Sequence, residues 1–99
     1  MTSRTQATVR IVGAGLIGTS VGLALSKLGV DVCIEDISPA VQSLAIDYGA
    51  GRIALAGDEP KLILVCVPPD VTAKVVAREL EAFPEAIVTD VASVKSAIL

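Results

Sequence analysis

The chain has 99 residues, enough for one domain with a buried core and too few for two. Hydrophobic residues make up 53% of it but only two are aromatic, so the apolar content is aliphatic, as in strands that helices cover on both faces. The net charge of −3 argues against nucleic-acid binding, and the absence of histidine excludes histidine-based catalysis and most zinc sites from these residues.

The first elements alternate between strand and helix. Residues 8–13 (TVRIVG) are a short aliphatic run that stops at a glycine, which is typical of a buried parallel strand. Residues 15–28 are apolar on nearly every side and predict a helix, with Gly29 as the residue that ends it. Residues 30–37 (VDVCIEDI) form a second run rich in β-branched residues and predict a second strand.

A strong helix-start signal follows the second strand. Ser38 is suited to cap a helix and Pro39 to occupy its first turn. The spacing of apolar residues predicts a helix that ends at Gly49. Its expected apolar stripe consists of Val41, Leu44, Ala45 and Tyr48.

The second half of the chain continues the alternation. Residues 52–55 predict a short third strand, and residues 62–67 (LILVCV) predict a buried fourth strand that the following prolines end. Asp70 is suited to cap the next helix. The expected apolar stripe of that helix is Val76, Leu80 and Phe83, opposite Lys74, Arg78 and Glu81. Residues 86–89 begin a fifth strand, and another helix is expected from Ser93.

Strands that alternate with helices predict an α/β fold with a doubly wound, Rossmann-like parallel sheet in the order 3-2-1-4-5, truncated after the fifth strand. In that order Cys33 and Cys66 lie on strands either side of the first strand, about 9–10 Å apart, which is too far for a disulfide. Two reduced cysteines favour a cytoplasmic protein. The apolar run 11–25 after Arg4 and Arg10 faintly resembles a secretory signal, but three of its four glycines fit another pattern, and the run is too short to span a membrane.

That pattern is the G-x-G-x-x-G motif formed by Gly13, Gly15 and Gly18, with Leu16 and Ile17 between the last two. The motif alone is a weak signal, but here it follows a predicted strand and opens a predicted helix, as in dinucleotide-binding proteins. The first glycine allows the tight turn, the second lets the backbone approach a pyrophosphate, and the third lets the helix pack on the strand. We therefore assign these five residues to cofactor binding; a glycine-rich turn without ligand is the alternative.

The end of the second predicted strand carries two carboxylates, Glu35 and Asp36. Asp36 shares a strand face with Val32 and Ile34 and is the better candidate to bind the adenosine ribose. Because a carboxylate there repels a 2′-phosphate and no arginine follows it, NAD is predicted in preference to NADP. Glu35 is interpreted as a solvated charge at the strand end.

Two further segments lie at the carboxyl ends of predicted strands. Val67, Pro68 and Pro69 follow the fourth strand and are expected to line the cofactor crevice, although a rigid strand exit explains them equally well. Ser93 and Lys95 follow the fifth strand, on the nicotinamide side. Their positions alone favour simpler interpretations, in which Ser93 is a helix cap and Lys95 is a solvated charge.

Three segments, VGAGLIGTSVGLAL, CVPPDVT and TDVASVKSAIL, together resemble the prephenate dehydrogenase family over residues 9–99. The D-V-A-S-V-K stretch, within the third segment, is the part most specific to the family. The segment of residues 49–61 is shorter than the corresponding segment usually is in the family. The resemblance implies NAD(P)-dependent oxidative decarboxylation of prephenate, or of arogenate, in tyrosine biosynthesis. It also implies that Ser93 lies beside the catalytic histidine and the substrate, with Lys95 at the start of the same helix.

In that family the catalytic histidine and an all-helical second domain lie in sequence that this chain does not contain. We therefore expect the 99-residue chain to bind nucleotide without turning over prephenate, and the full-length protein to be a homodimer. No metal, nucleic-acid or membrane partner is expected. One alternative is another two-domain NAD(P) dehydrogenase. A second is a stand-alone module that binds NAD and senses redox state. The apolar excess and the abrupt end of the chain argue against the second alternative.

Overall fold

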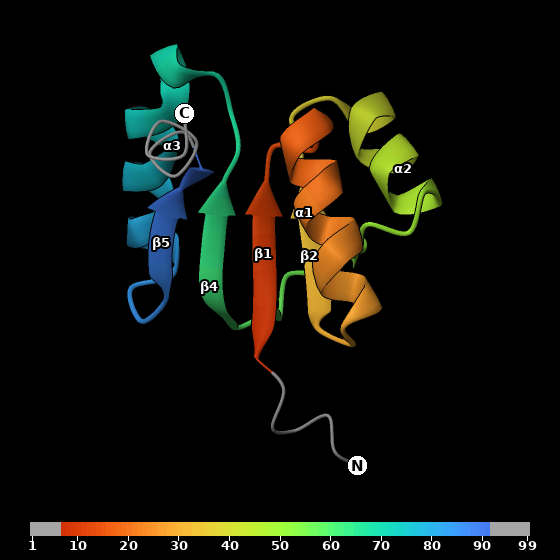
Figure 1. Cartoon of the computed structure of the whole chain (residues 1–99). Helices are drawn as coiled ribbons and strands as arrows, with labels where there is room; N and C mark the ends of the chain where they lie inside the picture. Colours follow the sequence, from red (N-terminus) through yellow and green to blue (C-terminus); the bar gives the residue numbers. More distant parts are fainter. Residues whose placement is uncertain (1–6, 92–99) are drawn as a thin grey trace.

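Five strands and three helices make up residues 7–91, the part of the chain that the computed structural model describes (Figure 1). In chain order they are β1 (Thr8–Val12), α1 (Leu16–Lys27), β2 (Asp31–Glu35), α2 (Pro39–Asp47), β3 (Arg52–Ile53), β4 (Pro60–Val65), α3 (Pro69–Ala82) and β5 (Ile87–Asp90). All the elements predicted within this range are present. The helix expected from Ser93 lies outside the described residues.

The strands form one parallel sheet in the order β3-β2-β1-β4-β5, which confirms the predicted fold class and strand order. Val12, the last residue of β1, pairs with Glu35 on one side and with Val65 on the other. The carboxyl ends of the three central strands therefore lie level at one edge of the sheet. In such sheets the loops that leave this edge, where the strand order reverses, form the ligand crevice.

The fourth strand begins and ends earlier than predicted: β4 starts at Pro60 and leaves the sheet before Cys66. A proline at the first position of a strand removes only one hydrogen bond from the ladder. Pairing ends after Val65 because β1, its neighbour, ends at Val12 where the glycine-rich loop turns away. One further hydrogen bond, from the Cys66 N–H to the Val12 carbonyl at 2.8 Å, aligns the residues that follow.

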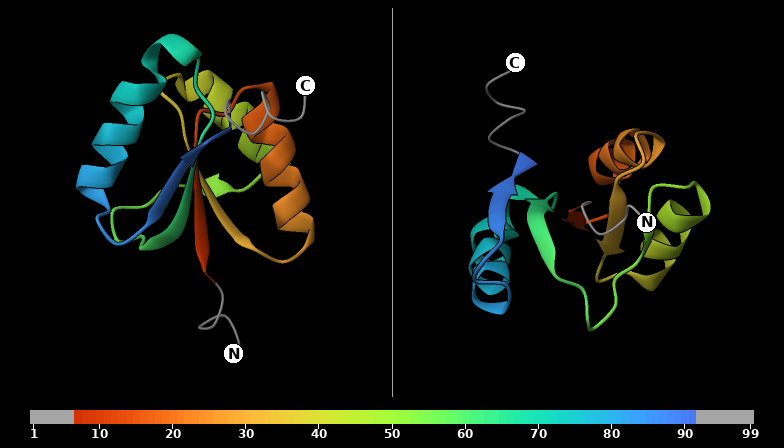
Figure 2. Two further views of the ribbon diagram at one scale, coloured as in Figure 1. Left: turned by 60° about the vertical axis from the view of Figure 1, so that its left-hand side comes forward. Right: turned by 90° about the horizontal axis from the view of Figure 1, so that it is seen from below.

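Alternation along the strands sends side chains to two different cores. Ile11 and Ile34 are fully buried under α1 and α2, together with Ala45 of α2. Ile63 and Val65 point the other way and pack against α3. Figure 2 shows the result, with α3 on one side of the sheet and α1 and α2 on the other.

The helix ends follow the predicted signals with one exception. The Ser38 hydroxyl accepts a hydrogen bond from the Val41 N–H at 3.3 Å, as expected of a cap. Gly29 and Gly49 have the positive φ that ends a helix. The prediction for Asp70 was wrong, because α3 already begins at Pro69 and Asp70 lies inside its first turn. There a carboxylate still interacts favourably with the positive end of the helix dipole.

The two predicted apolar stripes are only partly buried. Along α2, Ala45 is buried, whereas Leu44 and Tyr48 are 53% and 64% exposed. Along α3, Val76 and Phe83 pack against the core, but Leu80 is 48% exposed. Short aliphatic side chains already fill the space between helix and sheet, so the larger residues at the flanks of each stripe stay at the surface.

The connection from β3 to β4 (residues 54–59) has no helix. An ion-pair cluster holds it instead: the Arg52 guanidinium bonds both Asp31 and Asp58, with nitrogen–oxygen distances of 3.0 and 2.8 Å. Asp58 also accepts the Leu55 N–H at 2.7 Å. Within the described part of the chain, this short crossover leaves a region of the sheet, on the side of α3, without a helix over it.

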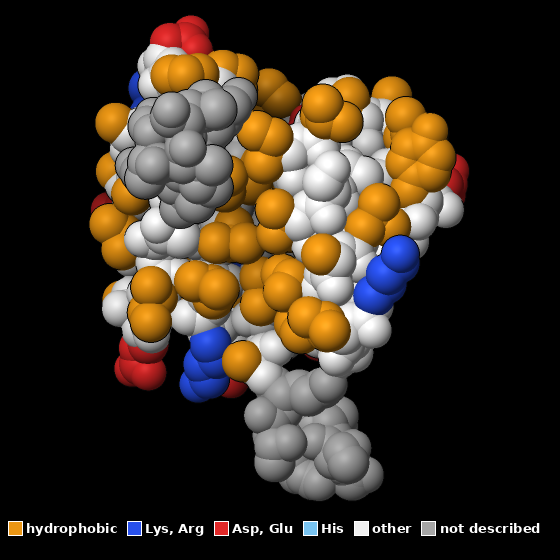
Figure 3. Space-filling view, viewed as in Figure 1, with side chains coloured by type: hydrophobic (Ala, Val, Ile, Leu, Met, Phe, Trp, Pro, Cys, Tyr) orange, Lys and Arg blue, Asp and Glu red, His pale blue; other side chains and the backbone are white. Residues whose placement is uncertain are grey.

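Among residues 7–91, the opposite side of the sheet also has a part that no helix covers. Hydrophobic side chains gather over β4 and β5 in the view of Figure 3. Leu62 and Leu64 of β4 are half-buried there, and Ile87 of β5, which pairs with Leu62, is 69% exposed. Among residues 7–91 no helix is long and apolar enough to cross a membrane.

Candidate functional site

The glycine-rich loop joins the end of β1 to the start of α1. Gly13 has a φ of 99°, and a Cβ there would lie 2.5 Å from the Cys66 carbonyl oxygen. A Cβ on Gly18 would lie 2.1 Å from the Gly13 carbonyl oxygen. These two contacts bring the helix down onto the strand and the loop against the end of β4, and any side chain would prevent them.

Gly15 differs from the other two glycines of the motif, because a Cβ added to it would meet no atom of the protein within 4 Å. It is the residue before α1, and no side chain caps the helix there. The space over Gly15 is therefore open, beside a helix N-terminus whose first N–H groups carry partial positive charge. This is the arrangement that binds a phosphate group.

Asp36 links that loop to the start of α2. One carboxylate oxygen accepts the Ala14 N–H and the other accepts the Ser38 N–H, each at 2.7 Å. An ionised carboxylate has about four lone-pair positions, so it can accept further hydrogen bonds from a ligand. Asp36 is half-buried and lines the mouth of the groove that opens beside it.

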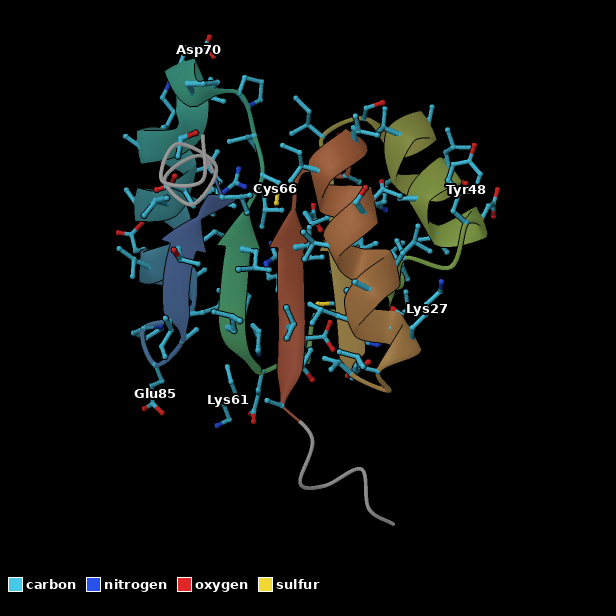
Figure 4. All side chains as sticks on the ribbon, viewed as in Figure 1. Lys27, Tyr48, Lys61, Cys66, Asp70 and Glu85 are labelled. Atoms are coloured by element: carbon cyan, nitrogen blue, oxygen red, sulfur yellow. The ribbon has the colours of Figure 1, made fainter. Side chains whose placement is uncertain are left out.

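That groove has a volume of about 820 Å³ and lies between the end of β2 and helix α3. Its apolar walls come from the loop after β2, the first turn of α2, the loop after β4 and the start of α3, and include Ile37, Val41, Val67, Pro68 and Val71. Figure 4 places Cys66, another lining residue, between the upper ends of β4 and β1. An apolar slot that leads to a carboxylate and a glycine-rich loop fits an adenine, a ribose and phosphates in turn.

A buried ion pair forms the inner wall of the groove, and the sequence analysis missed it. The Arg10 guanidinium donates from Nε and Nη2 to the two Glu79 oxygens, at 2.7 and 3.2 Å. Glu79 is only 2% exposed and is the one buried charged residue among residues 7–91. Glu35 stands 4.0 Å from Arg10, so this carboxylate is not simply a solvated charge.

Two signals could have revealed the pair. Arg10 interrupts an otherwise aliphatic run that was predicted to be a buried strand. Glu79 follows Val75 and Val76 by four and three residues, which places it on the buried face of α3. Burial alone would lower the pKa of Arg10, but the hydrogen bond and charge of Glu79 outweigh it and raise that pKa. The guanidinium also lies 5.1 Å from the centre of the Phe83 ring.

The two cysteines are free, as predicted. Burial raises the pKa of the Cys33 thiol to about 11 and that of the Cys66 thiol to about 11. Both thiols are therefore protonated at neutral pH, and neither has the lowered pKa of a nucleophile. Within residues 7–91 no cluster of cysteine, aspartate and glutamate could hold a metal ion.

The structure brings most of the predicted site residues to one edge of the sheet. Those that line the groove are Gly13, Gly15, Asp36, Val67 and Pro68. Gly18 supports the loop from below, and Leu16 and Ile17 lie in the exposed first turn of α1. Pro69 starts α3 and does not line the groove. Ser93 and Lys95 lie outside the described residues.

Comparison with known proteins identifies the family. The family model described as "Prephenate dehydrogenase, nucleotide-binding domain" matches residues 21–99. A probable prephenate dehydrogenase of Streptomyces niveus, NovF, is 41% identical over 88 residues, which cover 89% of this chain and 24% of that protein. The chain therefore spans about a quarter of the length of this relative.

Two solved structures share the fold. The crystal structure of Synechocystis arogenate dehydrogenase superimposes with a TM-score of 0.74 at 23% identity, over 84% of this chain and 32% of that one. The 3-hydroxyisobutyrate dehydrogenase of Mycobacterium tuberculosis gives a TM-score of 0.63 at 21% identity, over 87% of this chain and 31% of that one. With the match to its nucleotide-binding domain over most of the sequence, the chain belongs to the prephenate dehydrogenase family.

Proposed function

We propose that this chain is the NAD-binding part of a prephenate dehydrogenase, which oxidatively decarboxylates prephenate to 4-hydroxyphenylpyruvate in tyrosine biosynthesis. The observation that carries the proposal is the open space over Gly15 beside Asp36, in a chain of this family. The bound nicotinamide would supply the chemistry by accepting a hydride from the substrate ring. The residues of this chain bind and orient the dinucleotide.

Each part of the dinucleotide has a matching part of the site. The glycine-rich loop and the first N–H groups of α1 face the pyrophosphate, with Leu16 and Ile17 at the rim. Asp36 accepts hydrogen bonds from the adenosine ribose hydroxyls. Val67 and Pro68 form an apolar wall for the adenine, and Pro69 follows them at the start of α3.

NAD is the proposed cofactor rather than NADP. Each oxygen of the Asp36 carboxylate already accepts one backbone N–H, and these bonds hold the negative charge where the ribose 2′-hydroxyl would bind. A 2′-phosphate there would be repelled, whereas a hydroxyl can donate to the carboxylate. Ile37 and Ser38, which follow, carry no positive charge that could offset the repulsion.

The remaining parts of the proposal concern the whole protein. Ser93 is proposed to lie on the substrate side of the nicotinamide, next to a histidine supplied by sequence outside this chain. Because these 99 residues contain no histidine, we propose that they bind NAD without turning over prephenate. The complete enzyme is proposed to be a cytoplasmic homodimer.

Calorimetric titration of the chain with NADH and with NADPH tests the cofactor assignment. NADH is expected to bind at least about tenfold more tightly than NADPH, because the 2′-phosphate meets the Asp36 carboxylate. Asp36→Asn, which removes the charge but keeps one acceptor oxygen, should narrow that ratio. Absence of NADH binding by the folded wild-type chain would contradict the proposal.

The substrate is tested on the complete polypeptide, by following NADH formation with prephenate, with arogenate and with 3-hydroxyisobutyrate. Faster turnover of prephenate than of arogenate is the expected result. Turnover of 3-hydroxyisobutyrate alone would assign the domain to another two-domain dehydrogenase. NADH formation from prephenate by the isolated 99-residue chain would contradict its proposed inactivity.

A further inference from the structure

The peptide group between Glu35 and Asp36 is held from both sides. Its carbonyl oxygen accepts the Gly13 N–H at 2.8 Å, from the glycine-rich loop. Its N–H donates to the Gln42 side-chain oxygen at 2.9 Å, from the first turns of α2. The plane of this peptide is thus fixed between the loop on one side and α2 on the other.

Gln42 is itself held in a fixed register. Its backbone N–H donates to the Ser38 carbonyl at 3.0 Å, and the Ser38 hydroxyl caps the same turn. The side chain is half-buried and reaches back along the helix to the strand end. Gln42 therefore does more than continue the helix, because its side-chain oxygen is the acceptor for the backbone N–H of Asp36.

From this geometry we infer that Gln42 is a positioning residue that sets the preference for NAD over NADP through Asp36. The inference rests on the proposed function. The two backbone bonds to the Asp36 carboxylate orient its side chain, and Gln42 fixes the backbone from which that side chain extends. Without Gln42, the Asp36 N–H has to find water, and the strand end can rotate the carboxylate away from the 2′ position.

The test compares three variants of the chain by calorimetric titration with NADH and NADPH, each after a thermal melt that establishes folding. Gln42→Leu has a similar volume but cannot accept a hydrogen bond. Gln42→Glu keeps an acceptor oxygen and adds negative charge. Ser43→Leu alters an exposed neighbour on the same helix and is the matched control.

Gln42→Leu is expected to weaken NADH binding about three- to tenfold, which is the effect of losing one hydrogen bond, and to weaken NADPH binding by less. The dissociation constant for NADPH divided by that for NADH should therefore fall. Gln42→Glu should keep or increase that ratio, and Ser43→Leu should leave it unchanged. If Gln42→Leu does not fold, Gln42→Asn, which is one methylene too short to reach the Asp36 N–H, replaces it.

Equal weakening of both nucleotides by Gln42→Leu would assign Gln42 a structural role alone and overturn the inference, while the cofactor assignment would stand. An unchanged ratio in every variant would overturn it in the same way. A wild-type chain that folds but binds neither nucleotide would overturn both the proposed function and this inference.

Discussion

The two faces of the sheet hold their helices in different ways. Under α1 and α2 the buried side chains are aliphatic, with Ile11 and Ile34 at the centre, and contact depends on small residues such as Gly18. On the face of α3, the aliphatic cluster around Ile63 is smaller, and the Arg10–Glu79 pair lies beside it. The first face is a close-packed core, whereas the second combines packing with charge.

This difference follows from the crossovers. α1 and α2 together cover their face over β1 and β2, so apolar strand residues there are shielded from water. On the other face the β3–β4 connection has no helix, and the same strands are left open to the groove. Charged residues can occupy such a place if they are paired, and Arg10, Glu35 and Asp31 of these strands all have ionic partners.

The largest expected effect is on the close-packed face. Gly18→Ala places a Cβ where the Gly13 carbonyl oxygen lies, so strand and helix have to separate, and we expect a loss of about 4 kcal/mol or more in unfolding free energy. Urea denaturation followed by circular dichroism measures it. Gly15→Ala, which meets no protein atom, is the control and should unfold within about 0.5 kcal/mol of wild type. Equal stability of the two variants would contradict the close packing.

The next effect is on the charged face. Glu79→Ala leaves the Arg10 guanidinium, which is 12% exposed, without its main partner, and should cost about 3 kcal/mol. Replacing both residues with leucine removes the buried charge together with its partner and should restore most of that loss. Glu81→Ala, at an exposed position of α3, is the control for urea denaturation. A loss below about 1 kcal/mol for Glu79→Ala would show that water reaches the arginine freely.

A smaller loss of unfolding free energy is expected at the start of α2, on the close-packed face. Ser38→Ala removes the acceptor for the Val41 N–H at the start of α2 and should cost about 1 kcal/mol. The exposed Ser43→Ala, in the middle of the same helix, is the control and should change the unfolding free energy little. Equal unfolding free energies of the two variants would mean that this hydrogen bond adds nothing to stability.

The smallest effect concerns the ion-pair cluster of the β3–β4 connection. Hydrogen bonds from Arg52 hold the pKa values of Asp31 and Asp58 below their ordinary 3.8. The stability that they contribute is therefore present above pH 4 and is lost as the pH falls through the lowered pKa values. In wild type this loss should be about 1 kcal/mol or less, since Asp31 and Arg52 are partly exposed.

Urea denaturation at pH 6, 4 and 3 measures the acid effect against Asp58→Asn. The variant lacks one of the titrating partners, so its unfolding free energy should fall less between pH 4 and 3 than that of wild type. A parallel fall in both proteins would remove Asp58 from the acid response.

Many structural features of this protein could be predicted from patterns in the sequence. The glycine-rich loop and the caps at Ser38, Gly29 and Gly49 depend on periodicity and on backbone conformation, which neighbouring residues determine. The strand order was predictable because strands that alternate with helices are joined by right-handed crossovers. The position of Asp36 at the end of the second strand was predictable for the same reason. Its hydrogen bonds to the backbone N–H groups of Ala14 and Ser38 depend on how the loop and α2 pack around it.

Only the tertiary structure decided which charged residues became buried and which apolar residues stayed exposed. Glu79 is buried because Arg10, 69 residues earlier in the chain, lies under it, and no local pattern contains that pairing. Leu44 and Tyr48 are exposed because smaller residues already fill the contact between α2 and the sheet. The sequence by itself determined where strands, helices and the nucleotide loop form, since those depend on short-range sterics and alternation. The walls of the groove depended on which distant side chains the crossovers brought together.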